Sequence, residues 1–238
     1  MSELKPRTLI SVQKHLRDQV ANALRAALIA GDLKPGVIYS APTLAAEYGV
    51  SATPVREAML DLAREGLVEA VRNKGFRVTE LSERDLDEFT EIRSLIEIPI
   101  IGQVTRSASR QELENLRPVA EEIVAAARAG DLIGYLESDR RFHLELLGLA
   151  GNARLVETVA DLRKRSRLYG LTALAEAGAL VASAQEHTAL LDLMLSGDAA
   201  AAEEHMRHHL AHVRTLWAAR DRDKPAEHAV SAGRPGIR

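Results

Sequence analysis

Residues 43–66 read TLAAEYGVSATPVREAMLDLAREG, a stretch that predicts two short helices joined by a tight corner. Gly49 supplies the corner, and Ser51 is placed to cap the second helix, because its hydroxyl can accept from an N–H of the first turn. Apolar residues then recur at the spacing of one helical face, namely Val55, Ala58, Met59 and Leu62. A glycine corner followed by such a face is typical of a helix-turn-helix.

The polar side chains of the second helix indicate what it could bind. Ser51, Thr53 and Arg56 lie away from the predicted apolar face. A small-residue N-terminal edge followed by an arginine suits a helix that enters the major groove of DNA end-first. An ordinary helical hairpin that leaves these residues in water is the alternative interpretation.

A basic hairpin directly after these helices favours the DNA-binding interpretation. Residues 67–70 and 76–79 are strand-like, and the Asn-Lys-Gly sequence between them predicts a hairpin turn. Its tip carries three cationic side chains, Arg72, Lys74 and Arg77. We expect this tip to lie along phosphates or to enter a minor groove, which makes the whole unit a winged helix.

Composition limits the class of protein. The chain has 238 residues, 46% of them hydrophobic but only 3% aromatic, which favours a mainly helical fold of two domains. It has no cysteine, which excludes disulfides, thiolate metal sites and cysteine nucleophiles. The net charge is −3, although residues 1–80 carry a net +2 and the remainder −5. With no apolar run long enough for a bilayer and no signal peptide, we expect a cytoplasmic protein with no membrane partner.

Periodicity along the chain predicts two domains and a tail. After a loosely ordered start over 1–10, a helix spans 11–30, and 37–39 could be a strand that pairs with the hairpin. From residue 82 onward the predicted helices cover 83–107, 109–129, 131–149, 152–168, 183–196 and 198–222. Residues 169–182 are a loop or a short helix.

Short connections between long amphipathic helices imply an antiparallel bundle. We therefore expect a winged helix-turn-helix domain over 11–81 and an all-α domain over 82–222. The tail over 223–238 has no core pattern and is expected to be disordered.

Histidines and one aspartate of the predicted bundle suggest a metal site. Asp139 and His143 are spaced i and i+4, so both lie on one helical face. His187 lies near the inward edge of its helix, and His209 adjoins the apolar stripe of the last helix. One carboxylate oxygen with three imidazole nitrogens suits Zn, Ni, Mn or Fe. The alternatives are a surface Asp–His pair and a solvated histidine-rich face.

Residues 15–215 resemble the GntR family of bacterial transcription regulators, in its FadR-like group with an FCD effector-binding domain. The motifs that carry the resemblance are LAAEYGVSATPVREAMLDLAREGLVEAVRNKGFRV, RSLIE, SDRRFH, AQEH and MRHHL. The resemblance implies a homodimer that binds palindromic operator DNA as a regulator, most simply a repressor. It also implies a small carboxylate effector that alters DNA affinity. Six predicted helices after residue 82 are similar to the shorter, VanR-like version.

The resemblance further implies site residues. In this family an Asp-x3-His helix and two later histidines hold a divalent metal, Zn, Ni or Mn, with Zn favoured. By position, these ligands are Asp139, His143, His187 and His209 in this chain. Arg93 and Glu97 match the family's R-x3-E, and Arg93 is a candidate to bind the effector, unless the two form an ion pair on a solvated face. Ala52 departs from the family, which commonly has an arginine there. A metal-dependent hydrolase with an appended nucleic-acid-binding domain is the alternative function.

Overall fold

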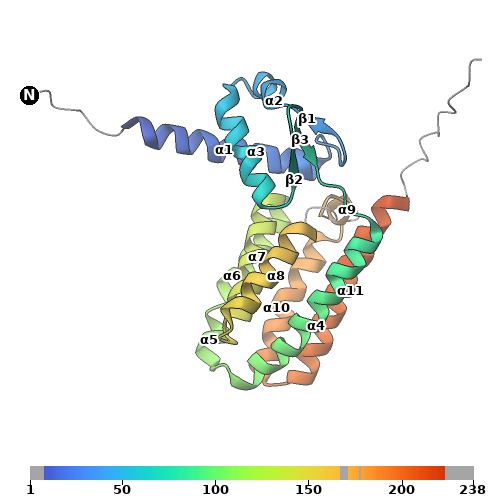
Figure 1. The fold of residues 1–238 in the computed structure, drawn as a ribbon. Helices are drawn as coiled ribbons and strands as arrows, with labels where there is room; N and C mark the ends of the chain where they lie inside the picture. The colour runs from blue at the N-terminus through green and yellow to red at the C-terminus, as the bar shows by residue number, and fades with distance from the viewer. Residues whose placement is uncertain (1–7, 167–170, 177, 223–238) are drawn as a thin grey trace, which may run out of the picture.

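The computed structural model describes residues 8–166, 171–176 and 178–222, which form two parts (Figure 1). The first, here called the winged part, contains α1–α3 and a small sheet. The second, here called the bundle, contains α4–α11 and lies below it in Figure 1. The tail expected over 223–238 lies outside the described residues, as do 1–7, 167–170 and 177.

Helix α1 (Thr8–Ala30) begins earlier than the sequence predicted. Residues 8–10 are helical, so the expectation of a loose start over 1–10 was wrong for these three. Val20 and Leu24 of α1 are buried in the winged part.

The helix-turn-helix consists of α2 (Ala41–Tyr48) and α3 (Ala52–Arg64). Gly49 ends α2 with φ 66°, a left-handed conformation that favours glycine, and its N–H donates to the Ala45 carbonyl. The apolar face of α3 is buried as predicted, with Val55, Ala58, Met59 and Leu62 inside. Ser51 occupies the N-cap position of α3, but its hydroxyl makes no capping hydrogen bond, so that part of the prediction was wrong.

The wing is a three-stranded antiparallel sheet of order β1-β3-β2, made of β1 (Ile38–Tyr39), β2 (Val68–Val71) and β3 (Gly75–Val78). Tyr39 pairs with Phe76, which confirms that the short strand joins the hairpin. The hairpin turn places Asn73 at φ 60°, and Gly75 follows at φ 135°. A Cβ on Gly75 would collide with the carbonyl oxygen of Tyr39, so the close approach of β3 to β1 requires glycine.

Eight helices of the bundle fall within the described residues. They are α4 (Glu83–Ser107), α5 (Arg110–Glu114), α6 (Arg117–Ala129), α7 (Leu132–Gly148), α8 (Ala153–Ser166), α9 (Leu171–Glu176), α10 (Leu180–Ser196) and α11 (Ala199–Arg222). Six of these are long, as expected, and α9 shows that part of 169–182 is a short helix. The single helix predicted over 109–129 was wrong. Pro118 has no N–H to donate and lies in the first turn of a new helix, so the chain breaks into α5 and α6.

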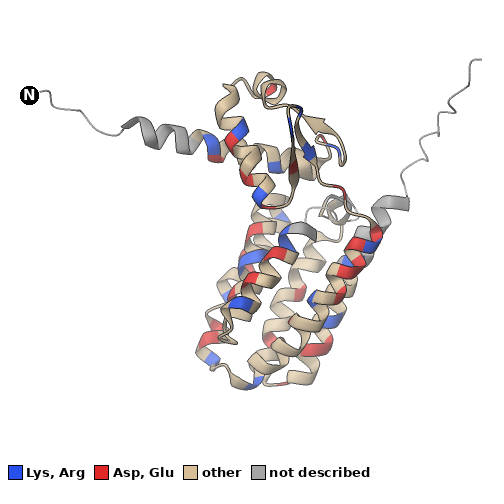
Figure 2. Ribbon diagram, in the orientation of Figure 1, with Lys and Arg blue, Asp and Glu red and all other residues tan. Residues whose placement is uncertain are grey.

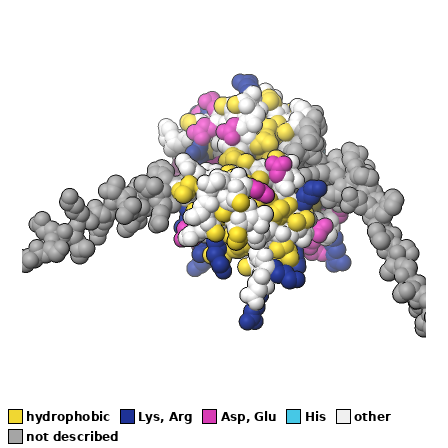
Figure 3. Space-filling view, turned by 90° about the horizontal axis from the view of Figure 1, so that it is seen from above, with side chains coloured by type: hydrophobic (Ala, Val, Ile, Leu, Met, Phe, Trp, Pro, Cys, Tyr) yellow, Lys and Arg dark blue, Asp and Glu magenta, His cyan; other side chains and the backbone are white. Residues whose placement is uncertain are grey.

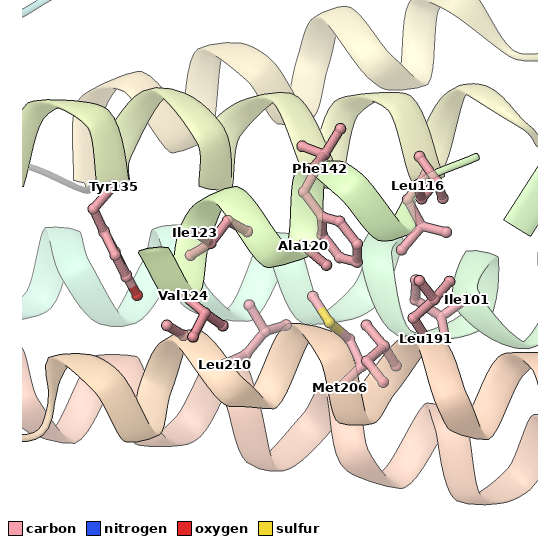
Figure 4. Packing of buried hydrophobic residues seen from close by; sticks show 14 of the residues in the cluster. Ile101, Leu116, Ala120, Ile123, Val124, Tyr135, Phe142, Leu191, Met206 and Leu210 are labelled. Atoms are coloured by element: carbon pink, nitrogen blue, oxygen red, sulfur yellow. The ribbon is translucent and has the colours of Figure 1, made fainter. Parts of the chain in front are cut away.

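Apolar side chains from most of these helices meet in one core (Figure 4). Phe142 of α7, Ile123 of α6 and Met206 of α11 are fully buried there. Ile29, at the end of α1, belongs to this core rather than to that of the winged part. Among the described residues, no helix combines the length and apolarity needed to cross a bilayer.

Candidate metal centre and nucleic-acid interface

Four predicted residues meet inside the bundle. Asp139 and His143 come from α7, His187 from α10 and His209 from α11, and each side chain is at most 3% exposed. One potential ligand atom from each residue lies within 4.8 Å of the others. The apolar stripes of three helices therefore bring these polar groups to a single point, as the helical spacing predicted.

Hydrogen bonds orient the ring of His187 toward this point. Its Nδ1 lies 3.0 Å from the carbonyl oxygen of Ala184, which can only accept, so Nδ1 carries the proton of the neutral ring. The Nε2 of His187 then has a lone pair and lies 3.1 Å from Nε2 of His143 and 3.0 Å from Oδ1 of Asp139. Two acceptor atoms that face each other at such a distance, as this Nε2 and Oδ1 of Asp139 do, favour a cation between them.

His209 shows the same orientation more strongly. Its Nδ1 lies 2.6 Å from a carboxylate oxygen of Glu186, so this nitrogen donates. Its Nε2 is buried and has no hydrogen-bond partner among the residues that the structure describes. A buried polar atom without a partner is unfavourable by about 1–3 kcal/mol. A metal ion at the centre would supply that partner.

The electrostatics favour neutral, lone-pair-bearing histidines. Burial, with the nearby Arg163 guanidinium, holds the pKa of His143 well below its ordinary value. Burial lowers the pKa of His209 to about 4, although the hydrogen bond to Glu186 opposes this shift. Both rings are therefore unprotonated near neutral pH, the form that binds metal.

The donor set itself fits a divalent transition metal. Three imidazole nitrogens and one carboxylate oxygen are typical ligands of Zn and of other first-row metals. Zn–N bonds are about 2.0–2.1 Å long, so two ligands on one ion lie roughly 3 Å apart, close to the 3.1 Å between His143 and His187. The residues present thus fit such an ion.

An ion-pair network surrounds Asp139, and the sequence did not reveal its central member, Arg163 of α8. Arg163 donates to Oδ2 of Asp139 at 3.0 Å and to Oε2 of Glu97 at 3.1 Å. Arg93 donates to the other oxygen of Glu97 at 2.6 Å. Burial alone would raise the pKa of Glu97, but Arg163 and Arg93 outweigh it and lower that pKa.

The Arg93–Glu97 ion pair therefore exists but is buried, so the alternative of a solvated face was wrong. A signal for Arg163 was present in the sequence. It falls at i+4 from Val159 and i+7 from Val156, on the apolar stripe of α8. A charged residue in such a position indicates a buried partner of opposite sign.

The predicted DNA-contacting residues lie on the surface of the winged part. Ser51, Thr53 and Arg56 are exposed at the N-terminal half of α3, as are Arg72 and Lys74 at the hairpin turn. Figure 2 shows Lys and Arg on the hairpin, whereas the outer helices of the bundle carry both signs interspersed. From above, Lys and Arg lie mostly along the edge of the face, around hydrophobic side chains in its middle (Figure 3).

Arg77 differs from the other two cations of the hairpin. Its guanidinium donates to Glu69 on the neighbouring strand at 2.7 Å. This cross-strand pair neutralises part of the charge that Arg77 would offer to a phosphate. The pair was not expected from the sequence, because it depends on the strand register.

Comparisons with known proteins agree with this arrangement. The family described as "Bacterial regulatory proteins, gntR family" matches residues 16–78, and the family described as "FCD domain" matches residues 88–212. Over 195 residues the chain is 32% identical to the HTH-type transcriptional regulator McbR of Escherichia coli (strain K12), covering 82% of this chain and 87% of McbR.

Two further matches extend this finding. A "Probable D-xylose utilization operon transcriptional repressor" of Paenarthrobacter nicotinovorans is 32% identical over 196 residues, covering 81% of this chain and 84% of its own. The solved structure "E. coli McbR/YncC" superposes with a TM-score of 0.66 at 27% identity, covering 87% of this chain and 98% of that chain. These relatives are named as regulators, which gives no support to the hydrolase alternative.

Proposed function

Because the chain belongs to the GntR family of bacterial regulatory proteins and carries an FCD domain, it is a DNA-binding transcriptional regulator and not an enzyme, and we propose that a small carboxylate bound at a divalent metal in the bundle controls its DNA affinity. The observation that carries this proposal is the buried Nε2 of His209, which faces three other potential ligands and has no hydrogen-bond partner among the described residues.

Asp139, His143, His187 and His209 would hold the metal. The ion would supply a concentrated positive charge that attracts an anionic ligand into the bundle. The protein's own residues set up this attraction, because imidazole ligands add no negative charge and the charge of Asp139 is already partly neutralised by Arg163.

Charge balance in the bundle supports an anionic effector. Among the residues whose burial the structure describes, the fully charged side chains buried in the bundle are Arg93, Arg163, Glu97 and Asp139, two of each sign. A divalent ion would add two positive charges to a low-dielectric interior, which is strongly unfavourable without a compensating anion. Carboxylates are suitable anions, and the guanidinium of Arg93 has N–H donors besides the Nε that binds Glu97.

The winged part would bind the operator as one half of a homodimer. Ser51, Thr53 and Arg56 would face the major groove, and Arg72, Lys74 and Arg77 would lie along phosphates. Two copies related by a two-fold axis would match a palindromic site. Repression would follow where such a site overlaps a promoter.

Metal analysis of the freshly purified full-length protein tests the site. We expect close to one Zn, Ni or Mn per chain, and its loss in Asp139→Ala and His143→Ala. His208→Ala is the matched control, because His208 is exposed on the same helix as His209 and pairs with Glu204 at the surface. Wild-type protein that holds no divalent metal, even after incubation with each ion, would contradict the metal site.

A thermal-shift screen of small carboxylic acids, with and without the metal, tests the effector. A true effector raises the melting temperature only in the metal-loaded protein and changes its affinity for operator DNA. Stabilisation that is equal in metal-free protein, or that leaves DNA binding unchanged, would count against control through the metal. Chemical conversion of the acid would instead support an enzyme.

A further inference from the structure

Glu186 of α10 accepts hydrogen bonds from three histidines of α11, two at its carboxylate and one at its backbone carbonyl. His205, His209 and His212 follow one another at i, i+4 and i+7, so their side chains lie on the same side of α11. His209 and His212 donate through Nδ1 to the two oxygens of Glu186, at 2.6 and 2.8 Å. His205 donates through Nε2 to the backbone carbonyl of Glu186 at 2.8 Å.

The bond to Glu186 fixes which nitrogen of His209 faces the metal centre. An ionised carboxylate can only accept, so the proton of the neutral ring stays on Nδ1 and the lone pair stays on Nε2. The ring also lies stacked on that of His143, with centroids 5.4 Å apart and planes 28° apart. Nε2 is the buried atom that has no hydrogen-bond partner among the described residues.

We propose that Glu186 is a positioning residue, which holds His209 in the tautomer and ring orientation needed to ligate a divalent metal. A carboxylate that accepts the N–H of one ring nitrogen of a histidine also makes the other ring nitrogen more basic and therefore a stronger metal ligand. The inference rests on the metal site proposed above. It adds that α10 supplies both a ligand, His187, and the group that orients the ligand of α11.

This role differs from simple packing of α10 against α11. The Glu186 side chain is 24% exposed and lies outside the apolar core, so replacing it with the isosteric glutamine should not unfold the bundle. Glutamine has a single accepting oxygen, and its amide nitrogen would face an N–H of the other histidine. The amide cannot accept from both rings, and a bond that it still makes to His209 is no longer charge-assisted, so the Nδ1–H tautomer of His209 loses support in either case.

The first experiment measures Zn²⁺ affinity of the full-length protein by competition with a chromophoric chelator. Glu186→Gln should weaken binding about 10–100-fold. Glu204→Gln is the matched control, because Glu204 also pairs with a histidine of α11, His208, but at the exposed surface. It should leave the affinity unchanged. His212→Ala keeps the bond between Glu186 and His209, so its affinity should stay within a few-fold of wild type.

The second experiment reads the tautomer without any metal, by two-bond ¹H–¹⁵N NMR of histidine-labelled protein. His209 should be protonated on Nδ1 in the wild type and in Glu204→Gln, and mixed or inverted in Glu186→Gln. Glu186→Asp restores a carboxylate at shorter reach and should recover part of the Zn²⁺ affinity if the charge, rather than the packing, is responsible.

The outcomes separate this inference from the proposed function. Wild-type protein that binds Zn²⁺ while Glu186→Gln binds it equally well would overturn the inference and leave the metal site standing. The inference is equally overturned if His209 keeps its proton on Nδ1 in Glu186→Gln. Wild-type protein that binds no Zn²⁺, Ni²⁺ or Mn²⁺ would remove the metal site and the inference together.

Discussion

Arg163 is the side chain on which the charges around Asp139 depend. It is 1% exposed and bridges Asp139 on α7 to Glu97 on α4, two carboxylates that are themselves fully buried. Removing one partner of a buried ion pair strongly destabilises the folded protein, because it leaves the other charge buried and uncompensated. The contribution of Arg163 is therefore best seen through what its removal leaves behind.

Arg163→Met should lower the free energy of unfolding by about 3–5 kcal/mol, because it leaves buried negative charge uncompensated. Urea titration followed by circular dichroism measures this loss. Arg154→Met is the control on the same helix, since the Arg154 side chain is 88% exposed and its pair with Glu157 should contribute less than about 1 kcal/mol. Equal effects of the two substitutions would show that the network carries no special stability.

Acid should destabilise the metal-free protein. A histidine in the unfolded chain takes up a proton as the pH falls through 6.5. In the folded protein burial lowers the pKa of both rings, so His209 stays neutral down to about pH 4 and His143 stays neutral well below pH 6.5. The unfolded state thus binds more protons in this window, and stability falls with pH, by up to about 1.4 kcal/mol per unit for each histidine. The lowered pKa values of Glu97 and Glu186 extend the loss to lower pH.

Urea titrations of metal-free protein between pH 7 and pH 4 check this slope. His209→Gln removes one of the titrating groups, so its profile should be shallower than that of the wild type. A flat wild-type profile would mean that these rings are charged or hydrated in the folded protein.

Among single residues, the sequence identified those whose positions follow from helical periodicity. Asp139 and His143 share a face by spacing alone, and the inward placement of His187 and His209 follows from neighbouring leucines. Glu186 and Arg163 were not identified, because their roles depend on which helices are neighbours. No single-helix pattern contains that information, although the place of Arg163 in an apolar stripe was a usable hint.

Among the elements, the wing depends on one backbone position. Gly75→Ala should destabilise the protein by about 1–3 kcal/mol, because φ is 135° and the added Cβ would meet the Tyr39 carbonyl on β1. Gly49→Ala provides the comparison, with φ 66° and nothing within 4 Å of its Cβ, so only the backbone conformation opposes it. Thermal melts that rank Gly49→Ala as the more damaging would contradict this explanation of the wing.

The two cations Lys74 and Arg77 should differ in their contribution to DNA binding. Lys74→Ala should reduce the slope of log affinity against log salt by about 1, since one phosphate contact is lost. Arg77→Ala should have a smaller effect, because Glu69 already neutralises part of its charge. Fluorescence anisotropy with a duplex selected by the wild-type protein measures both slopes, and Arg154→Ala on α8 is the neutral control.

Element boundaries followed the sequence except where one residue decided them. Gly49 and the apolar face of α3 placed the helix-turn-helix correctly. Pro118 divides an expected helix into α5 and α6, because proline is favoured in the first turn of a helix and disfavoured within one. The hydroxyl of Ser51 was expected to cap α3, yet a favourable residue at a cap position does not ensure that its rotamer reaches the backbone.

In the whole molecule, α4 leaves large apolar side chains in contact with solvent. Leu95 is 71% exposed and Ile92 is 42% exposed, one turn apart on the same face. We expect this face to lie in the homodimer interface. Leu95→Glu should therefore shift the protein toward monomer in sedimentation analysis and weaken operator binding. Val37→Glu, at an exposed apolar position of the winged part, should leave the dimer intact.

Helix α1 gives Val20 and Leu24 to one hydrophobic core and Ile29 to the other. A rigid helix shared in this way leaves little opportunity for either core to open alone. Amide hydrogens of α3, far from the histidines, should consequently exchange more slowly with deuterated solvent once a ligand has tightened the bundle. Any ligand that stabilises the bundle would then also suppress opening of the winged part, because the two cores share this helix.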